Sequence, residues 1–109
     1  MYVSRPAKIP ELMSVIRACL QEGRYVDTRH ALERQDERRI NRPEILYVLK
    51  HGHHEKSKDT FSEFHHSWNY SVRGETVDRR ELRVIVSFDE DGMLIITALE
   101  PRKRSHQWK

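Results

Sequence analysis

Residues 82–99 decide the fold class, and they read LRVIVSFDEDGMLIITAL. In residues 82–88, apolar side chains at every second position alternate with other residues, which is typical of a half-buried β-strand. The turn-forming sequence Asp-Glu-Asp-Gly follows, and residues 93–99 are then apolar at almost every position. A nearly continuous apolar run of this length is typical of a central strand. The stretch therefore predicts two antiparallel strands joined by a tight turn.

Further strand signals lie upstream of this hairpin. Residues 68–72 alternate between apolar and polar side chains, and Gly74 follows them, so a third strand is expected there. A weaker signal lies within residues 57–66. Residues 25–26 are expected to form a short extended segment.

The first third of the chain contains an amphipathic helix. Apolar side chains recur along residues 12–20 with the spacing of one helix face, and Gly23 supplies a stop. Cys19 is the single cysteine of the chain and lies on this apolar face. We therefore expect it to be a buried thiol without a disulfide partner.

Two more helices are expected before the strands. The first is the heavily charged segment 29–40, with Asp27 or Thr28 as its N-cap. It holds few apolar residues and should lie across the surface. The second begins at Asn41 with the pattern of a capping box and ends at Gly52.

This element order predicts an α+β domain, in which N-terminal helices pack on a small antiparallel sheet of three or four strands. The chain has 109 residues, the length of a single domain. We expect its core within residues 10–100 and a short basic tail over residues 101–109.

The composition favours a soluble protein with a densely ionic surface, since 37% of residues are hydrophobic and 34% are charged. No apolar run approaches the roughly 18 residues of a membrane span, and the N-terminus lacks the apolar region of a secretion signal. These features predict a cytoplasmic location. A formal net charge of +3 permits a polyanionic partner without demanding one.

Three basic or titratable side chains line up on the charged helix. His30, Arg34 and Arg38 recur every four residues and therefore share one helix face. Like charges stacked in this way cost roughly 0.2–0.5 kcal/mol per pair, so a solvated helix would more often place a carboxylate there. The stripe favours a phosphate-bearing partner. A solvated face with ion-pair partners elsewhere stays open as the alternative.

An ordered set of motifs is similar to a known bacterial family. The motifs are Arg-His-Ala-x-x-Arg and Arg-Arg-Ile within residues 29–40, a helix ending in Gly52, Trp68-x-Tyr70 with Gly74, Leu82-Arg83-Val84, and Ile95-Ile96-Thr97. Together they resemble the DUF4258 family over roughly residues 25–100. In element order that family resembles the compact ribonuclease toxins of the RelE type and the related BrnT toxins. The resemblance implies helices on a small antiparallel sheet, RNA cleavage without a metal, and a partner antitoxin protein.

Cleavage of RNA without a metal needs a base, an acid, and cations that stabilise the charged phosphorane. Under this resemblance His30 is the base or acid candidate, because imidazole titrates near neutrality and a helix N-terminus disfavours its charged form. Arg34 and Arg38 would hold the phosphate, and Arg83 would add a further cation. The alternatives are a capping or carbonyl-bonding role for His30 and surface ion pairs for Arg34 and Arg38.

Contacts with nucleic acid are expected in two further places. Trp68 and Tyr70 are candidates for stacking on a base, although such aromatic residues also suit a protein core. In the tail, Arg102, Lys103 and Arg104 are candidates for phosphate contacts.

Histidines cluster at residues 51–54 and 65–66, but neither paired cysteines nor a His-x-x-x-His helix spacing accompanies them. We therefore expect no metal and no cofactor. The first functional hypothesis is an RNA-cleaving toxin with RNA and an antitoxin as partners. A non-catalytic nucleic-acid- or protein-binding module of the same fold and a metal-binding accessory domain are the alternatives.

Overall fold

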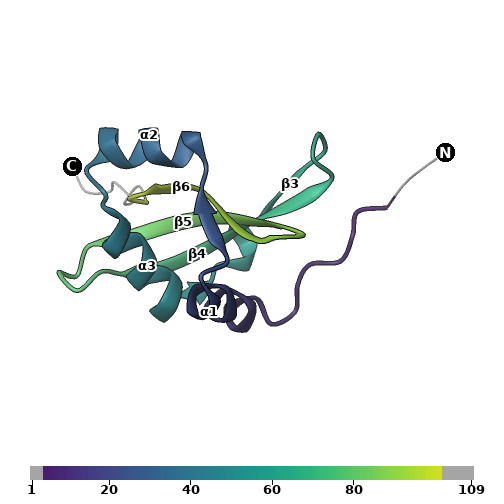
Figure 1. Cartoon of the computed structure of the whole chain (residues 1–109), viewed down its shortest axis with the longest axis horizontal. Coiled ribbons are helices and arrows are strands. Elements are labelled where there is room, and N and C mark those ends of the chain that lie inside the picture. The colour runs from purple at the N-terminus through teal and green to yellow at the C-terminus, as the bar shows by residue number, and fades with distance from the viewer. Residues whose placement is uncertain (1–3, 102–109) are drawn as a thin grey trace, which may run out of the picture.

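The computed structural model describes residues 4–101. Within this range the chain forms three α-helices, one 3-10 turn and six strands (Figure 1). In chain order the elements are α1 (Leu12–Glu22), β1 (Tyr25–Asp27), α2 (Arg29–Arg38), α3 (Arg42–His51), β2 (His53–His54), the 3-10 turn η1 (Lys56–Lys58), β3 (Thr60–Ser62), β4 (Ser67–Glu75), β5 (Glu81–Asp89) and β6 (Gly92–Leu99).

The three helices begin and end close to the positions that the sequence predicts. Gly23 ends α1 in the left-handed conformation, and Thr28 caps α2 by accepting a hydrogen bond from a backbone N–H. The charged helix ends at Arg38, earlier than expected, because Arg39 takes the left-handed conformation. Asn41 and Glu44 form the predicted capping box of α3. Within residues 4–101 none of the helices is long and apolar enough to span a membrane.

The sheet is larger than expected and mixed. Its strand order is β1-β6-β5-β4-β2, and β3 pairs with β4 outside this path. The β4–β5–β6 meander confirms the predicted antiparallel strands. The prediction of a purely antiparallel sheet of three or four strands is wrong, because β1 pairs with β6 in parallel and β2 and β3 both pair with β4. The extended segment expected at residues 25–26 is β1, and the weaker strand signal within residues 57–66 contains β3. Strand β2 was not predicted, because two residues are too few to show an alternation.

The core lies between one face of the meander and the helices α1 and α3, which lie beside each other (Figure 1). Cys19 is buried in α1, as the sequence predicts. The main apolar residues of the core are Leu12, Ile16, Ile45, Val48, Leu49, Tyr70, Val72, Leu82, Val84, Val86, Met93 and Ile95. Since side chains alternate along a strand, Arg83 and Ile85 of β5 lie on the opposite face. We call this opposite side of β4, β5 and β6 the open face.

The charged helix α2 runs along β6 at the edge of the sheet (Figure 1). Thr28 Oγ1 donates to the carbonyl of Ile96 at 3.5 Å, and Arg38 Nη1 donates to the carbonyl of Ala98 at 2.8 Å. Ala31 is the buried residue of the helix. The helix therefore covers edge carbonyls of β6 that would otherwise be exposed to pairing with another chain.

Candidate functional site

Two rows of side chains cross the open face, with one residue from each of β4, β5 and β6. The rows are Arg73–Arg83–Leu99 and Ser71–Ile85–Thr97. The first row places two guanidinium groups directly opposite each other on neighbouring strands. Like charges in this arrangement destabilise a sheet. An anion between the two arginines would relieve this repulsion.

Glu55, in the connection after β2, supplies that anion. Its carboxylate accepts hydrogen bonds from Arg83 Nε at 2.7 Å, Arg83 Nη2 at 3.1 Å, Arg73 Nη1 at 2.9 Å and Ser71 Oγ at 2.9 Å. The hydrogen bonds from Arg83 are the main reason that the pKa of Glu55 is lowered to about 2, while partial burial acts in the opposite direction. Arg83 is therefore held by Glu55 and is not the free cation that the catalytic hypothesis requires.

A second carboxylate lies beside this cluster. The side chain of Asp59 is fully buried, and its Oδ1 accepts from the backbone N–H of Ser71 at 2.9 Å. Its Oδ2 lies 2.8 Å from His54 Nε2 and 3.0 Å from Lys8 Nζ. Ser71 joins the two carboxylates, because its hydroxyl donates to Glu55. Neither carboxylate was among the residues predicted from the sequence. The arginines at positions 73 and 83 on paired strands were the signal that could have located Glu55.

The stripe of α2 borders the open face. Arg38 Nη1 lies 3.3 Å from Thr97 Oγ1, and Thr97 belongs to the second row of that face. Arg34 and His30 lie one and two turns before Arg38 on the same side of the helix. Gln35 lies on the other side of the helix, where its Nε2 donates a hydrogen bond to Oδ1 of Asp27 in β1 at 3.0 Å. Three of the four predicted catalytic residues therefore lie in one line beside the open face.

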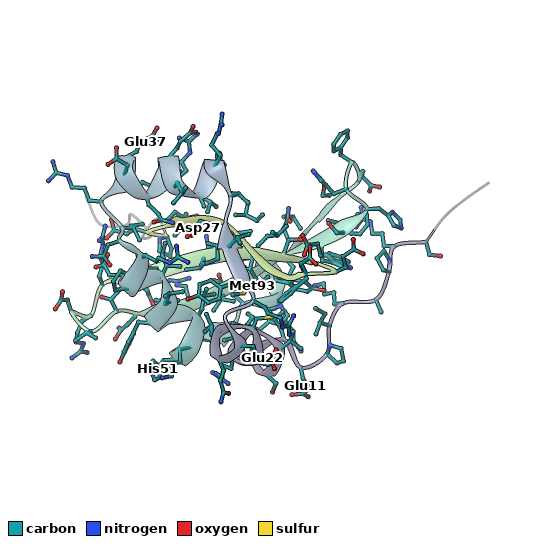
Figure 2. All side chains as sticks on the ribbon, viewed as in Figure 1. Glu11, Glu22, Asp27, Glu37, His51 and Met93 are labelled. Carbon is teal, nitrogen blue, oxygen red and sulfur yellow. The ribbon has the colours of Figure 1, made fainter. Side chains whose placement is uncertain are left out.

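The environments of these three residues differ. The side chain of His30 is exposed and makes no hydrogen bond or ion pair with another of the residues 4–101. Arg34 forms an ion pair of 2.7 Å with Glu37, which lies on the side of α2 that points away from the strands (Figure 2). Arg38 is engaged at the β6 edge. No hydrogen bond or ion pair within the described residues joins any of them to Arg83, so these interactions do not assemble the predicted catalytic set into one cluster.

The two aromatic candidates have structural partners. Tyr70 is buried in the core, and its hydroxyl accepts a hydrogen bond from the N–H of Ile9 at 3.0 Å. It is therefore not available to stack on a base. Trp68 donates from Nε1 to the carbonyl of Pro6 at 2.8 Å and packs edge-to-face on Phe61, with ring centroids 5.1 Å apart. Trp68 thus helps to hold the N-terminal segment against the sheet.

Two groups of residues named from the sequence remain, the basic tail and the clustered histidines. Arg102, Lys103 and Arg104 lie outside the described residues. Among residues 4–101, no three histidine, cysteine or acidic side chains come together in an arrangement that could hold a metal ion.

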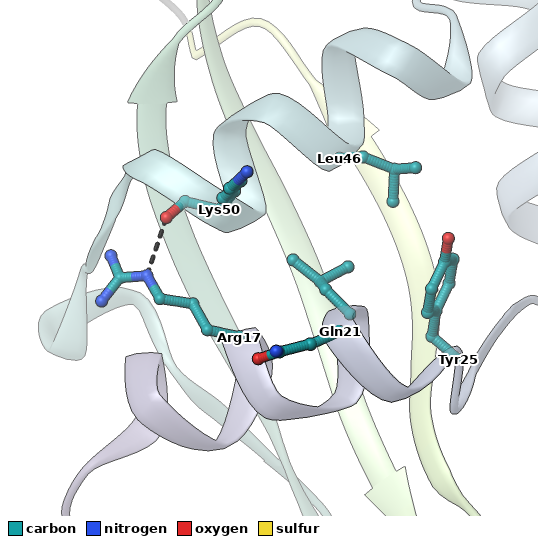
Figure 3. A pocket seen from close by; sticks show the side chains of 6 residues that line it. Arg17, Gln21, Tyr25, Leu46 and Lys50 are labelled. Atoms are coloured by element: carbon teal, nitrogen blue, oxygen red, sulfur yellow. Dashed lines mark hydrogen bonds between the residues drawn. The ribbon is translucent and has the colours of Figure 1, made fainter.

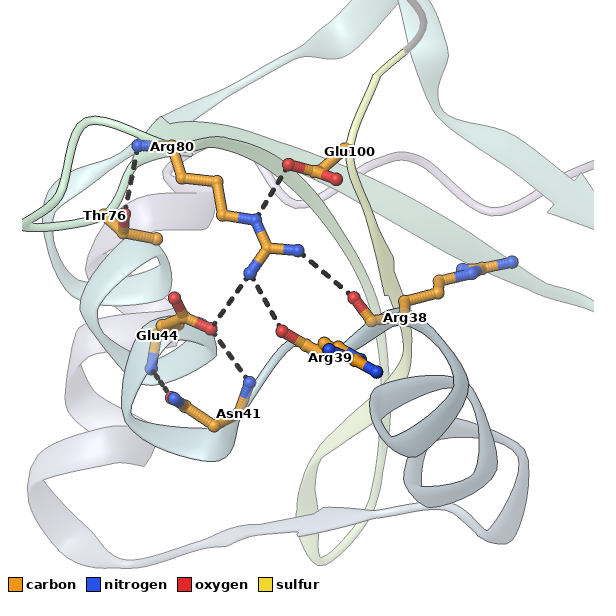
Figure 4. Close-up of polar contacts among 7 residues, drawn as sticks. All are labelled: Arg38, Arg39, Asn41, Glu44, Thr76, Arg80 and Glu100. Carbon is orange, nitrogen blue, oxygen red and sulfur yellow. Dashed lines mark hydrogen bonds and ion pairs between the residues drawn. The ribbon is translucent and has the colours of Figure 1, made fainter.

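Arg80 fixes the position of α2 (Figure 4). Its guanidinium donates to the carbonyls of Arg38 at 3.1 Å and Arg39 at 2.9 Å, to Glu44 at 3.5 Å and to Glu100 at 2.8 Å. The hydrogen bond to Glu100 is the main reason that the pKa of Arg80 is raised. One side chain thus joins the end of α2 to the start of α3 and the end of β6.

We expect Arg80→Lys to lower the free energy of unfolding by about 1–2 kcal/mol, because an ammonium group cannot reproduce the planar set of donors. Urea unfolding measures this loss. The neighbouring Arg79→Lys is the matched control: its side chain is 83% exposed, so its ion pair with Glu75 should contribute less than about 0.5 kcal/mol. Equal effects of the two substitutions would contradict the role of Arg80.

These features define a small α+β domain with a mixed sheet, two helices on one face and a polar cluster on the other. The family model DUF4258, a domain of unknown function, matches residues 28–100, from the N-cap of α2 to the residue that follows β6. The chain belongs to this family, as the sequence motifs predicted. No curated protein and no solved structure matches the chain.

Proposed function

We propose that this protein binds single-stranded RNA along the seam between α2 and the open face. The seam consists of His30, Arg34, Arg38, Ile85, Thr97 and Leu99. The alignment of three basic or titratable side chains beside the half-buried β5 and β6 residues of the open face supports this proposal most directly. The helix residues would contact phosphates, and the half-buried Ile85 and Leu99 would contact the sugars and bases.

The local charges allow such contacts. Arg34 is paired with Glu37, but exposed ion pairs of this kind contribute only about 0–1 kcal/mol. A phosphate can therefore replace the carboxylate at little cost. His30 is exposed at the first turn of α2, where backbone N–H groups and the helix dipole also favour an anion.

A metal-independent ribonuclease of the RelE-like toxin group, with an antitoxin as partner, is the second candidate. The exposed His30 favours it, since a free imidazole one turn from Arg34 can exchange a proton with a bound ribose. The engagement of Arg83 by Glu55 favours binding alone. Binding is for this reason the first proposal, and cleavage is tested on the same RNA.

The test uses a fluorescently labelled single-stranded oligouridine and anisotropy at two salt concentrations. We expect the affinity to fall steeply as salt rises, because phosphate contacts release counterions. Arg34→Gln should weaken binding about fivefold. This substitution is preferred to one at Arg38, whose loss would also expose the β6 edge. Lys50→Gln removes an equal charge from the opposite side of the domain and should change the affinity less than twofold. Equal losses in the two variants would contradict the proposed seam.

Single-turnover incubation of the same RNA with EDTA tests cleavage. If the second candidate holds, His30→Ala should slow cleavage by about 10²–10⁴-fold without lowering the melting temperature. Binding without any cleavage by the unsubstituted protein would reject the ribonuclease and retain the binding module. Cleavage that is lost in EDTA and restored by zinc would reject the metal-independent mechanism.

A further inference from the structure

A groove of about 540 Å³ lies between α1 and α3 (Figure 3). It belongs to the helix side of the domain and is separate from the open face. Its lining residues are Arg17, Leu20, Gln21, Tyr25, Leu46 and Lys50. Leu20, Tyr25 and Leu46 are only partly buried and form its apolar part. No carboxylate is among the lining residues.

The two cations of the groove keep their positive charge unneutralised. Arg17 Nε donates to the carbonyl of Lys50 at 2.7 Å, and Arg17 Nη2 donates to the carbonyl of Gly52 at 3.4 Å. Both acceptors are neutral backbone groups at the end of α3. Lys50 is exposed, and its ammonium forms no ion pair with another of the residues 4–101. Both cations lie near the C-terminal end of α3, where positive charge interacts favourably with the helix dipole. This interaction leaves them accessible to an anion from a partner.

We propose that this groove binds an acidic amphipathic helix from a partner protein. Apolar side chains of that helix would pack on Leu20 and Leu46, and its carboxylates would lie at Lys50 and Arg17. We infer an acidic partner from charge complementarity, since two cations and no acidic residue line the groove. A helix suits the shape, because the ridges of α1 and α3 form the kind of groove into which a third helix packs.

The dimensions agree with a short helical contact. Leu46 and Lys50 lie one turn apart on α3, and Arg17 and Gln21 lie one turn apart on α1. The groove therefore accepts about two turns of a partner helix, or three to four apolar anchors. An RNA strand would meet the same two cations, but the groove between the ridges of α1 and α3 matches the shape of a third helix, so the groove favours protein.

The probe is a synthetic amidated peptide of about 14 residues, built from leucine on one face and glutamate on the other. Its matched control has lysine in place of every glutamate. In titrations followed by ¹⁵N NMR, we expect the acidic peptide to shift the amide signals of α1 and α3 and the lysine peptide to shift none. Shifts confined to α2 and the open face, or no shifts at millimolar acidic peptide, would overturn the proposal.

Two substitutions test the same contact from the side of the protein. Lys50→Glu should weaken binding of the acidic peptide at least about tenfold. Lys58→Glu, an equal charge change on η1 outside the groove, should change the affinity less than twofold, which controls for net charge. Arg34→Gln should leave the affinity for the peptide unchanged while it weakens the binding of oligouridine. The proposal for the groove and the proposal for the seam can therefore fail independently. Equal effects of Lys50→Glu and Lys58→Glu on the affinity for the peptide would show a non-specific charge effect and would overturn the proposal that the groove binds it.

Discussion

Gly92→Ala should lower the free energy of unfolding by about 4 kcal/mol, the largest loss expected from any single substitution considered for this domain. Gly92 opens β6 with a φ of +139°, a backbone conformation that residues with side chains rarely adopt. A Cβ there would lie 2.4 Å from the carbonyl oxygen of Arg24. That oxygen cannot easily move away, because it accepts the N–H of Met93 at 3.0 Å where β1 begins its parallel pairing with β6.

Gly23→Ala is the matched control for this prediction. Gly23 also has a positive φ, of +70°, but a Cβ there would meet no heavy atom within 4 Å. We expect a loss of only about 1–2 kcal/mol, the cost of the left-handed conformation alone. Urea unfolding at neutral pH measures both variants. Equal losses would mean that the contact with Arg24 contributes nothing beyond backbone strain.

Glu55→Gln should lower the free energy of unfolding by about 3 kcal/mol at neutral pH. The pKa of Glu55 is lowered from 4.5 to about 2, and one pKa unit corresponds to about 1.4 kcal/mol. The carboxyl is largely buried, with 15% of its side chain exposed, so little of this energy is lost to screening by solvent. The amide would leave Arg83 without a neutralising charge, and Arg73 would keep only its ion pair of 2.9 Å with Glu81.

The same prediction fixes the pH dependence. Because the folded pKa is depressed, the stabilisation is fully present above about pH 4.5 and is lost as the pH falls through about 2. The difference between the wild-type protein and Glu55→Gln should therefore shrink over this window. Glu63→Gln is the control, since its ion pair with Arg5 is exposed and should contribute at most about 1 kcal/mol. A pH-independent difference for Glu55→Gln would contradict the depressed pKa.

Local physics explains which parts of this protein the sequence by itself determined. The caps of α2 and α3 depend on contacts between residues three positions apart, as between Asn41 and Glu44. The β5–β6 hairpin depends on side-chain alternation and on the turn at Gly92. The family membership and the line of basic residues along α2 also follow from the order of residues in the chain.

The tertiary structure alone decided how these elements meet. The parallel pairing of β1 with β6 joins residues almost seventy positions apart. The three residues of β1 are too few for their sequence pattern to predict which strand they pair with. Arg83 looked like a free cation in sequence, but the fold brings Glu55 to it from 28 positions away. Arg80 likewise finds acceptors in three other segments. A charged side chain takes whichever opposite charge the packed backbone places within reach, and no local pattern specifies that partner.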